Sequence, residues 1–385
     1  MRGGVPNVDV PKVTREAGNQ MNTHFNANSV SIDRRDALAL LVGAGVALTG
    51  GAPLAAQAQT TPRFSPAQVL NGADARVFPT EIKSELKRLA PNVYAFIQSQ
   101  PEGWSSFNIS NCGVVVGADS LVAIDAGAAP LMAKKLVADA HRATGKRFRR
   151  AVITHVHGDH TNGTQFLDVA DVIAHEQCRM AMTKLSNQPK PANWAKRENW
   201  ADGTEEFKLS IPNLSFSEKL TLHQGATDIE LINLGPAHTA GDTLVYLPNE
   251  KILFAGDIGS FGVTPLHGSG YAAGVIKTCD KILEMDVVTI VPGHGPVGGK
   301  TELAEMRDYF ILIQREGKKH YDAGVTAGRA AAEIDLGKYN SWVDVDRIST
   351  NMARMYSEFS GTISPDQDFA SFVKAREEYT ALKRR

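Results

Sequence analysis

Residues 151–164, with the sequence AVITHVHGDHTNGT, bring several chemically active side chains together in a short stretch of the 385-residue chain. The four ligand-type residues are His155, His157, Asp159 and His160. Imidazole nitrogens and carboxylate oxygens suit zinc and its neighbouring metals. Side chains alternate along an extended segment, so His155 and His157 point the same way. A lone histidine is more often an ordinary polar residue, but four such residues within six positions predict a metal site.

Three later segments each place one more ligand-type residue beside glycine or proline. They are GPAHTAGDT with His238, FAGD with Asp257, and PGHG with His294. Taken alone, His238 could be a plain turn residue and Asp257 could cap a turn. His294 lies between two glycines at the end of an apolar run, where a functional role is favoured. Thr239 and Asp242 are expected to hold the His238 loop rather than to bind metal.

In this order, the four segments resemble the metallo-β-lactamase superfamily, whose signature is HxHxDH. The similarity extends from about Pro91 to Pro296. It implies an α/β fold, a four-layered αββα sandwich, with two metal sites. The first site would use His155, His157 and His238, the second would use Asp159, His160 and His294, and Asp257 matches the bridging aspartate. The expected cofactor is two Zn²⁺ per chain, with iron or manganese as alternatives.

The chemistry implied by this resemblance is hydrolysis. Two zinc ions that share a water lower its pKa to about 7, so that hydroxide becomes the nucleophile. We expect Asp159 and Asp257 to be the catalytic carboxylates as well as ligands, and no G-x-S-x-G nucleophile motif is found. Asp125 closes an apolar run. It could accept hydrogen bonds from behind the ligands, or merely stabilise its own turn.

Two residues narrow the choice within the superfamily. His157 stands where the electron-transferring di-iron branch has glutamate, and true β-lactamases generally lack the bridging aspartate that Asp257 matches. The sequence is similar to exported dinuclear hydrolases that act on small molecules. The sharpest hypothesis is hydrolytic dehalogenation of an electron-poor chloroaromatic such as chlorothalonil. The alternatives are hydrolysis of a lactone, β-lactam or thioester, and an iron-dependent sulfur dioxygenase.

Four residues are weaker candidates for the substrate pocket. Trp104, Trp194 and Trp200 could stack on a flat ring, although loop tryptophans are as often packing anchors. His267, in the loop after Asp257, could reach the cleft. Two tryptophans lie in an irregular stretch, residues 186–206, which is typical of a lid or binding loop.

Composition limits the classes of partner. The formal net charge is −1 and no basic stripe is present, which disfavours nucleic acid. We therefore expect a small-molecule substrate and water as the partners. The three cysteines are too few and too scattered for a disulfide framework, and we expect them to be buried apolar residues.

The N-terminal region predicts export. Residues 1–58 contain Arg34-Arg35, an apolar run at residues 37–48 and the small-residue site Ala56-Gln57-Ala58, which together resemble a twin-arginine signal. A chance arginine pair in a general secretory signal is the alternative, and Met21 could be the true start. The apolar run is too short to span a bilayer. We expect a periplasmic protein that is free of the membrane after signal cleavage.

The rest of the chain divides into a catalytic domain, residues 59–300, and a C-terminal helical extension, residues 301–385. Apolar, β-prone runs bounded by turn residues predict strands at residues 93–97, 112–116 and 121–124, and helical spacing predicts a helix at residues 129–144. A short helix is expected around residues 80–89. The extension should form three helices that either cover the sandwich or provide the face of a homodimer.

Overall fold

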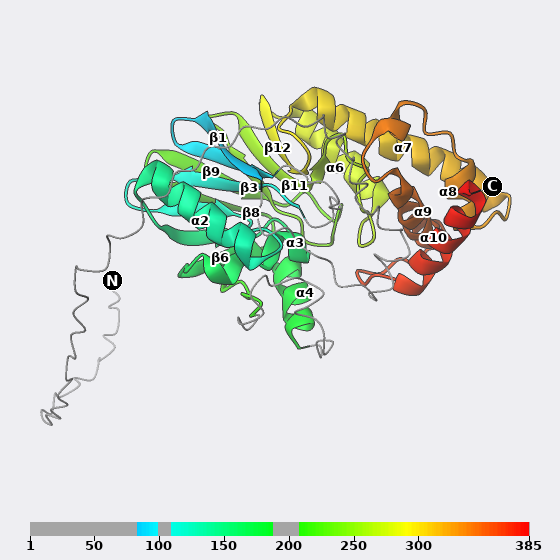
Figure 1. Cartoon of the computed structure of the whole chain (residues 1–385), viewed down its shortest axis with the longest axis horizontal. Coiled ribbons are helices and arrows are strands. Elements are labelled where there is room, and N and C mark those ends of the chain that lie inside the picture. Colours follow the sequence, from blue (N-terminus) through cyan, green and yellow to red (C-terminus); the bar gives the residue numbers. More distant parts are fainter. Residues whose placement is uncertain (1–82, 99–108, 188–207, 385) are drawn as a thin grey trace, which may run out of the picture. The chain divides into compact units, whose positions relative to one another are not determined.

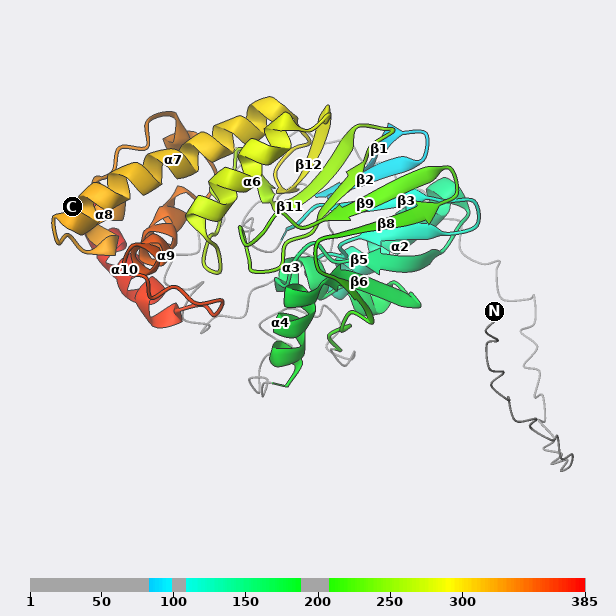
Figure 2. The same cartoon turned by 180° about the vertical axis from the view of Figure 1, so that it is seen from behind.

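A computed structural model of the chain describes residues 83–98, 109–187 and 208–384. Two β-sheets lie face to face, and helices cover both outer surfaces (Figures 1 and 2). Within these residues, one sheet has seven strands in the order β1-β2-β3-β4-β5-β6-β7, and the other has five in the order β12-β11-β10-β9-β8. The α/β sandwich expected from the sequence is confirmed.

The first sheet changes from antiparallel to parallel at β4. Its strands are β1 (Ser84–Ala90), β2 (Val93–Gln98), β3 (Cys112–Val116), β4 (Leu121–Ile124), β5 (Phe148–Val152), β6 (Asp171–His175) and β7 (Leu214–Phe216). The helices that follow its parallel strands are α2 (Pro130–Thr144), α3 (Gly158–Thr161) and α4 (Glu176–Ser186), with the 3₁₀ turn η2 (Thr164–Phe166) after α3. Parallel neighbours end at the same edge, so the segments after β4 and β5 meet there.

The second sheet is an antiparallel meander that ends in one parallel pair. Its strands are β8 (Lys219–Gln224), β9 (Thr227–Ile232), β10 (Leu244–Leu247), β11 (Ile252–Ser260) and β12 (Thr289–His294). Helix α6 (Ala272–Glu284) connects β11 to β12, which pair in parallel. This crossover brings the carboxyl end of β12 beside the second half of β11.

The cores follow from the period-two alternation of the strands. Val122 of β4 and Phe254 of β11 point into the space between the sheets. Their neighbours Ala123 and Leu253 point outward, beneath helices on opposite outer faces. Apolar residues on both faces of a strand are typical of a sheet covered on both sides, and the layered packing follows from that pattern.

The helix expected around residues 80–89 is wrong over its described part. Residues 84–90 form β1, which pairs antiparallel with β2 from Ser84 opposite Gln98 to Ala90 opposite Val93. The side chains of β1 are half-buried or exposed and none is fully buried, so the segment lacks a buried apolar stripe that could hold a helix on the core. Hydrogen bonding to β2 decides its conformation.

The C-terminal extension forms four α-helices within the described residues, not the three that were expected. They are α7 (Lys300–Asp322), α8 (Ala327–Glu333), α9 (Ile348–Phe359) and α10 (Phe369–Lys383), with short 3₁₀ turns η3 (Gly337–Ser341) and η4 (Val345–Arg347) between α8 and α9. Tyr309 and Phe310 of α7 and Met352 of α9 share one buried cluster with the outer face of the second sheet. Among the described helices, none is long and apolar enough to cross a membrane.

Candidate metal centre

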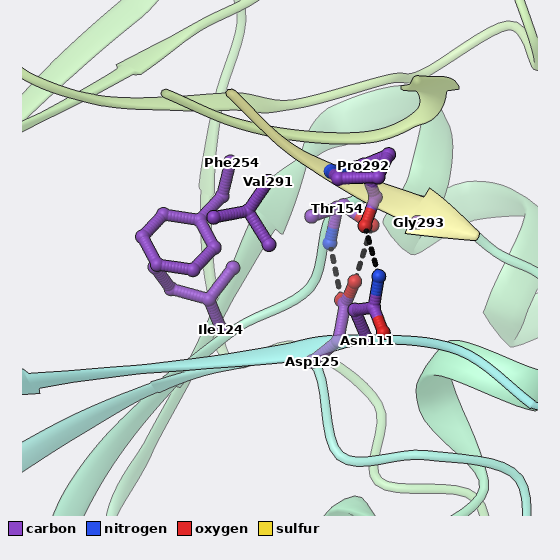
Figure 3. Close-up of a pocket in the computed structure, with 9 residues that line it drawn as sticks. Asn111, Ile124, Asp125, Thr154, Phe254, Val291, Pro292 and Gly293 are labelled. Carbon is purple, nitrogen blue, oxygen red and sulfur yellow. Dashed lines mark hydrogen bonds between the residues drawn. The ribbon is translucent and has the colours of Figure 1, made fainter. Parts of the chain in front are cut away.

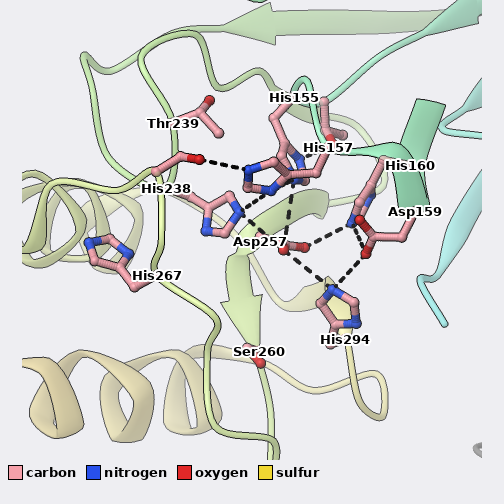
Figure 4. Close-up of polar contacts among 12 residues, drawn as sticks. His155, His157, Asp159, His160, His238, Thr239, Asp257, Ser260, His267 and His294 are labelled. Carbon is pink, nitrogen blue, oxygen red and sulfur yellow. Dashed lines mark hydrogen bonds and ion pairs between the residues drawn. The ribbon is translucent and has the colours of Figure 1, made fainter. Parts of the chain in front are cut away.

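Seven imidazole and carboxylate side chains, far apart in the sequence, come together at one edge of the sandwich (Figure 4). One group is His155, His157, His238 and Asp257, and the other is Asp159, His160, Asp257 and His294. Within each group the ligand atoms all lie within 4.8 Å of one another. The structure thus brings together every ligand that the sequence suggested, with Asp257 belonging to both groups.

A change of backbone conformation separates the two groups. His155 lies in a bend after β5 and His157 has extended backbone. The one-turn helix α3 then begins at Gly158 and carries Asp159 and His160. His238 comes from the loop between β9 and β10, Asp257 from β11 and His294 from the last position of β12. The segment after β5 therefore supplies four ligands, the parallel β11–β12 pair supplies two, and the loop between β9 and β10 supplies one.

The first group consists of three neutral imidazoles beside one carboxylate. The Nδ1 atom of His157 lies 3.1 Å from Nε2 of His155 and 2.9 Å from Nε2 of His238. Burial lowers the pKa of His155 well below its ordinary value, lowers that of His157, and lowers that of His238 to about 3. Neutral imidazole is the form that binds a metal ion.

The second group is more strongly charged. Oδ2 of Asp159 lies 3.4 Å from Nε2 of His160 and 3.2 Å from Nε2 of His294, and Oδ2 of Asp257 lies 3.3 Å from Nε2 of His294. Burial opposes the ionisation of Asp257, but the nearby histidines outweigh it and hold the pKa of Asp257 well below its usual range. Burial likewise opposes protonation of His294, but Asp257 and Asp159 together raise its pKa to about 9.

The donor set fits a pair of cations. Nδ1 of His157 faces two other ring nitrogens, although one hydrogen at most can lie on it. Nε2 of His160 and Oδ1 of Asp257 are buried and form an ion pair at 3.0 Å. Neither atom makes a hydrogen bond among the described residues. Buried polar atoms are normally satisfied. A cation in each group would satisfy these atoms with nitrogen and oxygen ligands suited to zinc.

Hydrogen bonds on the far side of each ring determine which nitrogen faces the centre. Nδ1 of His160 lies 2.7 Å from Oδ2 of Asp125, and Nδ1 of His294 lies 2.7 Å from the carbonyl oxygen of Ile109, which leaves both Nε2 atoms inward. His157 has the opposite orientation, since its Nε2 lies 3.1 Å from Oγ of Ser269. Such outer contacts set the tautomer and orientation of metal-binding histidines.

Asp125 lies behind the ligands, and its carboxylate joins three groups. It accepts hydrogen bonds from the backbone N–H of Thr154 at 2.8 Å and from Oγ1 of Thr154 at 2.6 Å (Figure 3). It also accepts one from Nδ1 of His160. Because Oγ1 of Thr154 donates its hydrogen to Asp125, its lone pair can accept a hydrogen bond from Nδ1 of His155, 3.1 Å away. Asp125 adopts a left-handed backbone, with φ of 58°, which aims its carboxylate at these donors.

Asn111 holds the His294 turn against the first sheet. Its Nδ2 donates to the carbonyl oxygen of Pro292 at 3.0 Å (Figure 3). The same Nδ2 donates to the carbonyl oxygen of Gly295 at 2.8 Å, and the backbone N–H of Asn111 donates to the carbonyl oxygen of Gly293. Sequence reasoning missed this residue, because an asparagine whose partners lie about 180 positions away leaves no local pattern.

The structure describes only some of the other residues and segments to which the sequence analysis assigned a role. The ring of His267 is buried 6.3 Å from that of His238, and neither ring nitrogen has a partner among the described residues. Asp242 accepts hydrogen bonds from Thr239 and ties down the His238 loop, as expected. Trp104, Trp194, Trp200, the signal at residues 1–58 and most of the loop at residues 186–206 lie outside the described residues.

Comparisons with known proteins show what this chain is similar to. The model of the Metallo-beta-lactamase superfamily matches residues 106–294. The chain is 25% identical over 226 residues to the Metallo-beta-lactamase type 2 of Bacteroides fragilis, which covers 57% of this chain and 82% of that protein. It is 26% identical over 235 residues to the 2,4-dinitroanisole O-demethylase subunit alpha of Nocardioides sp. (strain JS1661), covering 60% and 58% respectively.

A solved structure shares the fold over most of this chain. The stereoselective inverting sec-alkylsulfatase Pisa1 from Pseudomonas sp. superposes with a TM-score of 0.55 at 18% sequence identity. The match covers 72% of this chain and 50% of that chain.

Proposed function

Because the chain belongs to the metallo-beta-lactamase superfamily, we propose that it is a metal-dependent hydrolase of a small organic molecule. The proposal rests on the position of Asp257, whose carboxylate lies among the ligand atoms of both groups. A carboxylate that faces both groups is placed to be shared by two cations in a two-metal hydrolytic site.

The protein's own groups have distinct tasks in such a reaction. When bound, two zinc ions would lower the pKa of a shared water and stabilise negative charge that develops on the substrate. Asp159 and Asp257 are held ionised by the surrounding histidines, so they offset the charge of the cations. His155, His157 and His238 are kept neutral by burial and supply lone pairs without adding charge.

The substrate class that we favour is an electron-poor aromatic ring with a displaceable substituent. The support is the relative from Nocardioides, which by its name removes the methyl group of a dinitro-substituted aromatic ether. A chlorinated aromatic nitrile such as chlorothalonil belongs to the same chemical class, because its substituents also withdraw electrons from the ring carbon under attack. Hydrolytic dehalogenation is therefore our sharpest proposal.

A second candidate is hydrolysis of an acyl bond in a β-lactam, a lactone or a thioester. Its support is the relative from Bacteroides fragilis, a metallo-beta-lactamase by name. A third, iron-dependent oxidation of a persulfide, uses overlapping ligands and would require iron rather than zinc in the purified protein.

The test is a substrate panel assayed on the zinc-loaded chain and on the chain treated with chelator. We expect chloride release from chlorothalonil, loss of the activity on chelation, and its return with zinc. Turnover of nitrocefin or a thioester without chloride release would select the acyl substrates. Oxygen consumption with a persulfide would contradict hydrolysis, and failure on every substrate by a zinc-loaded chain would contradict the proposed function.

The N-terminal region supports a proposal of export to the periplasm. Arg34-Arg35 precede the apolar run at residues 37–48 in the order of a twin-arginine signal. We expect Arg34→Lys combined with Arg35→Lys to leave the full-length precursor in the cytoplasmic fraction. Normal processing of that double variant would contradict the twin-arginine route.

A further inference from the structure

The link between α9 and α10 lies against the metal centre, although it belongs to the C-terminal extension. We call residues 361–368 the C-terminal strap. The buried guanidinium of Arg354 donates to the carbonyl oxygens of Ser364 at 2.7 Å and Asp366 at 3.3 Å. The same guanidinium donates to the carbonyl oxygens of Ser269 at 3.2 Å and Gly270 at 2.8 Å. Arg354 therefore holds the strap against the loop that follows β11.

A second contact joins the strap to the other side of the site. Lys184, near the end of α4, lies 2.7 Å from the carboxylate of Asp366. Both side chains are exposed, so this pair contributes little to stability. It nevertheless shows that the strap bridges α4, which follows β6 of the first sheet, and α9 of the extension.

One strap side chain reaches towards a metal ligand. Nε2 of Gln367 donates to Oγ of Ser269 at 2.7 Å, and that oxygen lies 3.1 Å from Nε2 of His157. Nδ1 of His157 faces the other ligands, so its Nε2 carries the hydrogen and donates to Ser269. Oγ of Ser269 thus accepts two hydrogen bonds, one from the strap and one from the ligand.

We propose that Ser269 and Gln367 are positioning residues for His157, so that the C-terminal strap completes the first group of ligands. Ser269 is 6% exposed, and replacing its hydroxyl would leave the ring N–H of His157 without an acceptor in a nearly water-free place. Gln367 acts one step further out by fixing the position of the Ser269 hydroxyl. Metal affinity, rather than substrate binding, is the property that these residues should control.

The test measures zinc binding by the full chain, stripped of metal and titrated in competition with a chromophoric chelator. The variants are Gln367→Ala, Ser269→Ala and the double variant. We expect one of the two zinc affinities to fall about tenfold or more, as is typical when an outer partner of a ligand is lost, while the other stays unchanged. The double variant should bind no more weakly than Ser269→Ala, because Gln367 acts through Ser269.

The matched control is Ser364→Ala, which changes an exposed side chain of the same strap that does not contact Ser269. We expect this control to bind zinc like the unmodified chain. Unchanged affinities in Gln367→Ala, equal losses in Gln367→Ala and Ser364→Ala, or additive losses in the double variant would each overturn the proposal. If Ser269→Ala fails to fold, the comparison of Gln367→Ala with Ser364→Ala still decides.

The inference rests on the metal centre of the proposed function, and the titration separates the two. An unmodified chain that takes up no zinc would contradict the centre itself. Two zinc ions bound equally well by the unmodified chain and by Gln367→Ala would contradict the positioning role alone. No substrate is needed, so the result is independent of the substrate class.

Discussion

Asp257 is the residue on which the two halves of the centre depend. Its carboxylate lies 3.2 Å from Nε2 of His238 in one group and 3.3 Å from Nε2 of His294 in the other. We expect Asp257→Ala to lower kcat/KM at least about a hundredfold, since ligands of a two-metal site act as a unit. Steady-state kinetics and zinc analysis would show the loss, with the secondary structure retained by circular dichroism. A fully active variant would contradict the assigned role.

Protonation of the second group should compete with metal. In the metal-free chain the pKa of His294 is about 9 rather than 6.5, and that of His160 is also raised, so both rings carry protons at neutral pH. We expect loading with zinc at pH 7.5 to release about two protons, and the zinc affinity to fall as the pH is lowered. Calorimetric titration in two buffers of different ionisation enthalpy measures this release. Binding without proton release would show that these rings are neutral.

The raised pKa of His294 also makes the stability of the metal-free fold depend on pH. A histidine whose folded pKa exceeds its unfolded value stabilises the fold below the unfolded pKa, and this stability is lost as the pH rises through the folded pKa. For His294 the loss should therefore fall between about pH 6.5 and 9. We expect the melting temperature of the chelated chain to decrease over that interval more than that of the zinc-loaded chain.

At the residue scale, the ligands could be predicted because they lie in short sequence motifs. The residues that position the ligands could not, because their hydrogen-bond partners are far away in the sequence. His155, His157, Asp159 and His160 occur within six positions, and His238, Asp257 and His294 each lie in a glycine-containing turn or strand end. Asn111, Ser269 and Gln367 had no such signal. Their hydrogen-bond partners lie roughly 100 to 180 positions away, and a single polar residue in a loop has many ordinary explanations.

At the scale of elements, the close packing of β11 against β12 determines where Asp257 and His294 meet. A Cβ atom at Gly293 would lie 2.0 Å from Oδ1 of Asp257 and 2.9 Å from the backbone of Gly256. We expect Gly293→Ala to displace Asp257 and to lower the zinc content below two per chain, which metal analysis would detect.

The control for that substitution is Gly145→Ala at the end of α2. Gly145 has φ of 69° and no atom near its missing Cβ, so alanine there adds only backbone strain. This variant should lose about 1 kcal/mol of stability but keep its metal. If Gly293→Ala also kept two zinc ions, β12 would not constrain the centre as described.

Elements with a clear apolar pattern were predicted well, and elements without one were not. The apolar strands β2, β3 and β4 and the amphipathic helix α2 were expected close to their observed bounds. The exposed segment of β1 was taken for helix, because pairing with β2 decides its structure and no local pattern reveals a partner. The division of the extension into four helices depends on turns such as Gly324, which local spacing alone did not locate.

At the scale of the whole molecule, the C-terminal extension is part of the core. Helix α7 buries five large side chains in a cluster that it shares with α6, the second sheet and the rest of the extension: Leu303, Met306, Tyr309, Phe310 and Ile313. Each contributes about 1.5–3 kcal/mol on burial, so their sum rivals the entire stability of roughly 5–15 kcal/mol of a typical protein. We expect a chain ending at residue 299 to lose cooperative thermal unfolding. A sharp transition at the normal melting temperature would show that the sandwich is independent.

The central claim is that two cations are held on either side of one shared carboxylate. Crystals of the zinc-loaded protein, measured with X-rays at the zinc absorption edge, test it most directly. We expect two anomalous peaks about 3.5–4 Å apart, with Asp257 between them. One peak should lie beside the group of His155, His157 and His238, and the other beside the group of Asp159, His160 and His294. A single peak, or peaks away from Asp257, would contradict the two-cation centre.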